Sequence, residues 1–131
     1  MPALREPDRA TDELAHAVIG AAIEVHRHLG PGFLENVYEE ALRVELRLRG
    51  ISYERQRPAK VEYKGEYVGE GRLDLLVGQR LVVELKAIRE VLPIHRAVVL
   101  SYLKATGNSL ALLINFNVAR LRDGVQRVVL S

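Results

Sequence analysis

Two neighbouring apolar stretches carry charged side chains: Leu73-Asp74-Leu75-Leu76-Val77 and Leu81-Val82-Val83-Glu84-Leu85-Lys86. Runs this apolar, bounded by a short turn, are typical of strands buried in the core of a sheet. A charged side chain in such a strand is costly unless it is paired or holds a metal ion. The two stretches therefore predict a pair of core strands that carries a functional site.

The loop between the two strands decides which charges face one another. Glu84 and Lys86 are two residues apart, so both project from one face of their strand. A two-residue loop at positions 78–79 would turn Asp74 to the other face. A three-residue loop at positions 78–80 places Asp74 opposite Glu84, with their Cβ atoms about 5 Å apart. We predict this register, or a bulge with the same effect.

Two facing carboxylates repel each other unless a cation lies between them, and carboxylate oxygens are ligands that Mg²⁺ or Mn²⁺ accepts. The spacing leaves open a structural ion pair between Lys86 and one carboxylate. A further acid, Glu35, opens a predicted helix and lies on one face of it with Tyr38, three residues later. Taken alone, Glu35 is an ordinary acid of a first helical turn.

Together these residues resemble a known family. Gly32, Glu35 and Tyr38 match the GxxExxY signature of a small group within the PD-(D/E)XK nuclease superfamily, and the charged residues of the two strands match that superfamily's D...ExK core. The similarity runs from about Asp12 to the C-terminus. It implies an α/β fold with a restriction-endonuclease-like core, a central mixed β-sheet flanked by α-helices, and metal-dependent cleavage of phosphodiester bonds in DNA or RNA.

The resemblance also implies roles for individual residues. Asp74 and Glu84 would bind Mg²⁺ or Mn²⁺, Lys86 would activate or orient the attacking water, and Glu35 would complete the acidic cluster as a catalytic and metal-binding residue. Three further residues would support the site or contact phosphate: Tyr38, Tyr102 and Lys104. The chain departs from the family at Val98, where a Gln is usual four residues before the tyrosine of the Tyr102-Leu103-Lys104 segment.

Length and composition predict one domain. A chain of 131 residues with 48% hydrophobic residues can bury a single core. We expect residues 1–10 to be a flexible N-terminal segment and residues 11–131 to form the domain. The net charge of +2 indicates no general polyanion-binding surface, so a basic patch must be local. The candidates, which could equally be solvated faces, are Arg43, Arg47 and Arg49, and Arg55, Arg57 and Lys60.

The absence of cysteine excludes disulfides and thiolate metal sites and fits a reducing cytoplasm. The first ten residues lack the apolar run of a signal peptide, and no apolar run approaches the ~20 residues that span a bilayer. We therefore expect a cytoplasmic protein without a membrane partner. A homodimer or a protein partner is compatible with so short a chain.

Periodicity predicts the order of the elements. An apolar stripe from Leu14 to Leu29 predicts a helix that Gly30-Pro31 ends, and a second helix is expected over about 34–49. Strands follow within 51–64 and in the charged pair. A helix should then run from Pro93 to about Thr106, followed by strands over 110–116 and 125–130.

The sequence favours a nuclease. The rival hypothesis is a catalytically inactive nuclease-fold module that binds nucleic acid or a protein partner, and a third is a structural ion-pair network without a ligand. The composition and motifs leave open the choice of DNA or RNA, the mode of cleavage and the oligomeric state.

Overall fold

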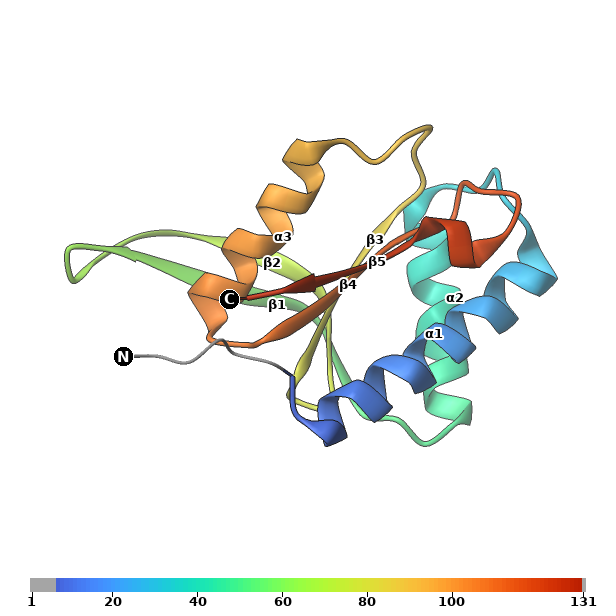
Figure 1. Ribbon diagram of the computed structural model, residues 1–131, viewed down its shortest axis with the longest axis horizontal. Helices are drawn as coiled ribbons and strands as arrows, with labels where there is room; N and C mark the ends of the chain where they lie inside the picture. The colour runs from blue at the N-terminus through green and yellow to red at the C-terminus, as the bar shows by residue number, and fades with distance from the viewer. Residues whose placement is uncertain (1–6, 131) are drawn as a thin grey trace.

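The computed structural model describes residues 7–130. It is an α/β fold in which one five-stranded sheet, in the order β1-β2-β3-β4-β5, is flanked by helices (Figure 1). The central pair, β3 and β4, is parallel, and the other neighbouring pairs are antiparallel. The expected mixed sheet of a restriction-endonuclease-like core is thereby confirmed. Its elements are α1 (Arg9–Leu29), α2 (Glu35–Leu48), β1 (Tyr53–Tyr63), β2 (Glu66–Val77), β3 (Leu81–Lys86), α3 (Pro93–Thr106), β4 (Leu110–Asn115), the 3₁₀ turn η1 (Leu121–Gly124) and β5 (Val125–Val129).

The sheet has a core on each face, because the residues of β3 and β4 alternate between two layers of helix. On one face, Leu85 and Ile114 pack with residues of α1 and α2, such as Ala22. On the other face, Val82 packs with Leu103 of α3. All six residues of β4 are buried, as expected for a strand covered on both faces. This accounts for the nearly continuous apolar run that the sequence shows there.

The helices begin and end where local chemistry predicts. The side chain of Asp8 accepts a hydrogen bond from the backbone N–H of Thr11 at 2.8 Å and so caps α1. Gly30 and Gly107 follow α1 and α3, and both have positive φ angles, 68° and 76°, that favour glycine. The helix α3 opens at Pro93, as predicted.

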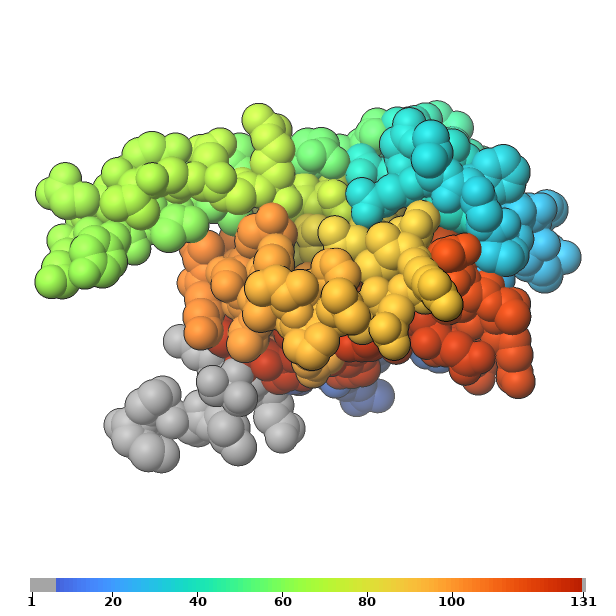
Figure 2. All heavy atoms as spheres, turned by 90° about the horizontal axis from the view of Figure 1, so that it is seen from above, coloured from blue at the N-terminus to red at the C-terminus, as the bar shows by residue number. Residues whose placement is uncertain are grey.

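The strands β1 and β2 form a long ribbon that projects beyond the body of the molecule (Figures 1 and 2). They pair over most of their length and turn at Lys64 and Gly65, as predicted. Residues 60–68 are all exposed, so this part of the sheet lacks a helix layer. Near the body the same two strands enter the core, and there β2 carries Asp74.

The N-terminal boundary differs from the expected one. The helix α1 begins at Arg9, two residues inside the segment that was expected to be flexible, because Asp8 supplies the cap. The rest of that prediction, for residues 1–6, lies outside the described residues.

Candidate active site

The hairpin of β2 and β3 has the predicted register. Val77 pairs with Leu81 and Leu75 pairs with Val83, so the next residues along the two strands, Asp74 and Glu84, lie opposite each other. Directly opposed residues of an antiparallel pair project from the same face. The three-residue loop is confirmed, and it brings the two acids together as the hypothesis requires.

The backbone pairing of β2 with β3 ends at Leu75 and Val83. At the next position, hydrogen bonds to the carboxylates replace the backbone hydrogen bonds between the two strands. The backbone N–H of Asp74 donates to Glu84 Oε1 at 2.8 Å, and the backbone N–H of Leu85 donates to Asp74 Oδ2 at 2.8 Å. Each acid is thus held by a peptide group of the opposite strand. The two side chains are fixed in position by the hairpin itself.

The strand β2 turns over at Asp74. Leu75 packs in the core beneath α1 and α2, whereas Leu73, two residues away, packs in the core beneath α3. In the β1–β2 ladder, Arg55 pairs with Leu75 and Arg57 pairs with Leu73. The residues between them, Gln56 and Asp74, are not paired. Gln56 has a φ angle of 52°, an uncommon conformation for a residue other than glycine. This irregularity interrupts the β1–β2 pairing beside the acid cluster, and the pairing resumes at Arg57 and Leu73.

Burial and like charge together raise the pKa values of the two acids. Glu84 is 6% exposed, and burial, followed by the charge of Asp74, raises the pKa of Glu84 to about 9. Burial also raises the pKa of Asp74, although the N–H of Leu85 opposes the shift.

Lys86 lies on the same strand face as Glu84 and is half-buried. Its charge lowers the pKa values of Asp74, Glu84 and Glu35 without cancelling the opposing effects. Between residues 7 and 130, no ion pair includes Lys86. A direct structural ion pair with one carboxylate is therefore wrong, and the ammonium group is available to another ligand.

The helix α2 brings two more acids to the cluster. Glu35, its first residue, is exposed, and partial burial of its carboxyl group, with the charge of Asp74, raises its pKa. Glu39 lies one turn later and is 7% exposed, and its charge contributes to the raised pKa of Asp74. The sequence analysis missed Glu39. Its spacing of four residues from Glu35 was the available signal, because such residues share a helix face.

Glu39 is tied to the irregular strand β1. Arg55 Nη2 donates to Glu39 Oε2 at 3.1 Å, and Gln56 Nε2 donates to both carboxylate oxygens at 3.2 Å. The unusual backbone conformation of Gln56 thus accompanies the hydrogen bonds of its side-chain amide to Glu39. These contacts join α2 to β1 beside the acid cluster.

Tyr38 supports the site from inside the core. It is 0% exposed, its hydroxyl group donates to the carbonyl of Gly30, and the backbone N–H of Phe33 donates to that hydroxyl at 3.2 Å. Its ring stacks on Phe116 with 4.5 Å between the centroids. Of the two roles predicted for Tyr38, this burial favours support of the site over a phosphate contact. Tyr38 positions the loop from which Glu35 enters α2.

The two candidates on α3 differ in their positions. Burial, followed by the charge of Glu84, raises the pKa of Tyr102, so this side chain lies beside the acid cluster. Lys104 is exposed and lines a separate hollow with Lys60 of β1, away from the carboxylates. Val98, in the place of the usual Gln, is 41% exposed on α3.

Asn115 fixes the chain after β3. It pairs with Lys86 in the parallel ladder, and it is buried. Its amide donates to the carbonyl of Ile88 at 2.9 Å and accepts from the N–H of Ile88 at 3.0 Å. These two hydrogen bonds hold the segment after Lys86 against β4 and so fix the backbone position of Lys86.

The donor set suits a hard cation only in part. Asp74 and Glu84 present carboxylate oxygens from one face, and burial, followed by the charges of neighbouring acids, raises their pKa values. A bound cation would offset both effects. Over residues 7–130, however, no group of three or more His, Cys, Asp or Glu side chains is arranged to hold a metal ion. The role of Glu35 as a third ligand therefore stays a prediction. Asp74 and Glu84 remain as the candidate pair.

Comparison with known proteins gives one match. A family model described as the PD-(D/E)XK nuclease superfamily matches residues 12–128, which includes every residue of the cluster. No curated protein and no solved structure matches the chain. Within the described residues, none of the helices is both long enough and apolar enough to cross a membrane.

Proposed function

Because the chain belongs to the PD-(D/E)XK nuclease superfamily, whose members generally use divalent metal ions, we propose that it is a Mg²⁺- or Mn²⁺-dependent nuclease. It would hydrolyse phosphodiester bonds in DNA or RNA. The observation that carries this proposal is the opposition of Asp74 and Glu84 across the hairpin, with Lys86 on the same face and in no ion pair. We further assign the chain to the GxxExxY group on its Gly32, Glu35 and Tyr38.

In this proposal Asp74 and Glu84 hold the metal ion. When bound, the ion would lower the pKa of a water molecule and offset the charge that grows on the phosphate. The ammonium group of Lys86 would donate to a phosphate oxygen and orient the water. Glu35, with a raised pKa and solvent access, would accept the proton of that water, because a base works best when its pKa approaches the working pH.

Cleavage assays test the proposal. Labelled single- and double-stranded DNA and RNA are incubated with Mg²⁺, Mn²⁺ or EDTA, and cleavage should require the metal ion. Asp74→Ala, Glu84→Ala and Lys86→Ala should each abolish it. Glu13→Ala, which removes an exposed acid of α1, is the matched control and should cleave normally. Cleavage by Asp74→Ala at the rate of the unaltered protein would identify a contaminating nuclease and remove the case for an enzyme.

A second candidate function is a nucleic-acid-binding module without catalysis. The lack of a third metal-binding side chain among the described residues favours it, as does Val98 in place of a polar residue. The same assays separate the two functions. Binding of nucleic acid without cleavage under every metal condition would select the module.

A further inference from the structure

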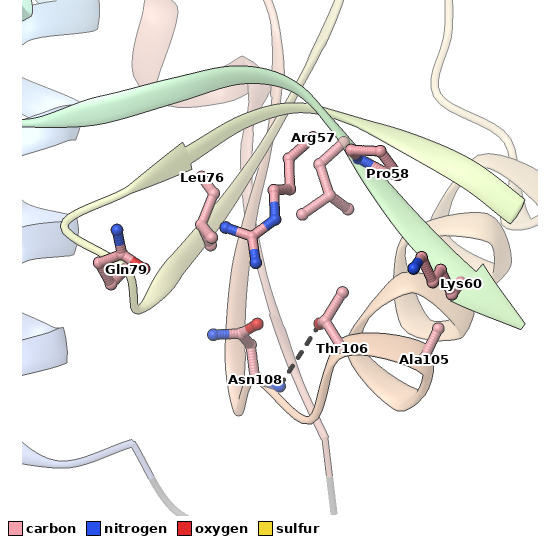
Figure 3. A pocket seen from close by; sticks show the side chains of 9 residues that line it. Arg57, Pro58, Lys60, Leu76, Gln79, Ala105, Thr106 and Asn108 are labelled. Atoms are coloured by element: carbon pink, nitrogen blue, oxygen red, sulfur yellow. Dashed lines mark hydrogen bonds between the residues drawn. The ribbon is translucent and has the colours of Figure 1, made fainter.

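A groove lies on the α3 side of the sheet, between the body-proximal part of β1 and β2 and the C-terminal end of α3 (Figure 3). Its volume is about 560 Å³, which is in the range of small-ligand sites. Pro58, Leu76 and Ala105 give the floor apolar surface above the fully buried Leu73. Arg57, Lys60, Thr106 and Asn108 supply polar groups. Arg57 points into the hollow toward Asn108 (Figure 3). Among the residues that the structure describes, none that lines the groove is acidic.

The groove contains two basic side chains, Arg57 and Lys60, and neither is held by a buried acid. Of the two basic clusters in the sequence, Arg43, Arg49 and Arg55 are all held by glutamates. Lys60 takes part in no ion pair between residues 7 and 130.

Arg57 pairs with Glu54 at 2.8 Å, but both side chains of that pair are about two-fifths exposed, 43% and 40%. Exposed pairs of this kind contribute little free energy, so a phosphate group can compete with Glu54 for Arg57.

The groove adjoins the acid cluster. Arg57 pairs with Leu73 in the β1–β2 ladder, and the residue after Leu73 is Asp74. Beyond Lys60, a second hollow continues along α3 past Lys104 and Ser101. The two hollows share Lys60, and the second also contains Lys104, Ser101 and one acid, Glu62.

We propose that this groove binds an unpaired segment of nucleic acid, an inference that rests on the proposed function for the choice of ligand. Arg57 and Lys60 contact consecutive phosphates, and an unpaired base lies on the apolar floor. A base in a duplex has both faces covered by its neighbours, so it cannot reach such a floor, whereas an unstacked base can. The site thus selects single-stranded over double-stranded nucleic acid.

Binding is measured in EDTA, where metal-dependent cleavage is silent. End-labelled single-stranded DNA, single-stranded RNA and a duplex of the same length are titrated with protein, and fluorescence anisotropy gives Kd over a series of salt concentrations. The variant is Arg57→Ala/Lys60→Ala. The control, Arg9→Ala/Arg47→Ala, removes two exposed charges from α1 and α2, so net charge is matched.

The unaltered protein should bind at least one single strand more tightly than the duplex. The groove variant should weaken that binding by about tenfold or more, and the slope of log K against log salt should fall by roughly 1.4, which is two phosphate contacts at about 0.7 each. The control should keep both the affinity and the slope. Equal losses in the two double variants, or equal affinity for duplex and single strand, would overturn the inference.

Filling the floor without removing charge is a second test. Ala105→Phe adds a ring to the α3 wall of the groove, and it should weaken binding of the single strand while the salt slope stays near that of the unaltered protein. A melting curve checks that the variant folds. Unchanged affinity in a folded Ala105→Phe variant would exclude a base on the floor.

The two proposals fail separately. If binding depends on the groove but no metal ion supports cleavage, the nuclease proposal fails and the binding site stands. If cleavage occurs but the groove variant binds normally, the groove inference alone fails.

Discussion

Replacing Asp74 by Asn should stabilise the metal-free protein, because it removes a charge that, after burial, raises the pKa of Glu84. Burial and the charge of Asp74 raise the pKa of Glu84 from 4.5 to about 9. An acid with a raised pKa keeps its proton in the folded state after the unfolded chain has lost it. The free energy of unfolding therefore decreases as the pH rises from the pKa of the acid in the unfolded chain to its pKa in the folded protein. At pH 7 the loss from Glu84 is at most about 3 kcal/mol, from 2.5 pKa units at 1.36 kcal/mol each.

The Asn side chain removes one charge and keeps the contacts. Its carbonyl oxygen can still accept from the N–H of Leu85, and its own backbone N–H can still donate to Glu84 Oε1. We expect the variant to gain about 1 kcal/mol or more at pH 7 in EDTA, which raises the melting temperature by roughly 3–4 °C for a domain of this size. Its stability should also fall less steeply between pH 5 and pH 8.

Added Mn²⁺ should reverse the order of the two proteins. A ligand at about 100 times its Kd stabilises the native state by roughly 2.7 kcal/mol, and the Asn variant should bind the ion poorly. Thermal melts of both proteins with EDTA and with Mn²⁺ measure this at two pH values. If the unaltered protein is the more stable one in EDTA and does not respond to Mn²⁺, the cluster is a structural network and the argument for a metal site is refuted.

Three further predictions concern the surrounding fold and are checked by urea denaturation. Tyr38→Phe should cost about 0.5–1.5 kcal/mol, because the half-buried carbonyl of Gly30 loses its donor, and an unchanged midpoint would show that this hydrogen bond is dispensable. Gly124→Ala should cost about 3 kcal/mol or more, since a Cβ there would lie 2.1 Å from the backbone oxygen of Asn115. Gly20→Ala is its matched control: the new Cβ meets only the flexible end of an arginine at 3.3 Å, so we expect a gain of up to about 1 kcal/mol, and a loss would contradict the reasoning.

The sequence alone determined the elements and the hairpin. The apolar period of α1, the proline that opens α3 and the glycines that follow both helices are local signals, and local signals set where helices begin and end. The pairing of Asp74 with Glu84 also followed from the sequence, because loop length fixes register and a slip of one residue would turn a core strand inside out. The resemblance to the nuclease superfamily, which rests on the charged residues of this hairpin, predicted the mixed sheet.

Only the tertiary structure decided which side chains surround that hairpin. Glu39 and Gln56 lie 17 residues apart in sequence, and they meet because α2 packs beside the point where β1 and β2 lose their regular pairing. Tyr38 matched a functional motif, yet its surroundings make it a buried support. The sequence presented two basic clusters as equals, and the packing of α3 against the sheet placed only Arg57 and Lys60 of them in the lining of a groove. Such choices depend on contacts between distant segments, and no spacing along the chain encodes them.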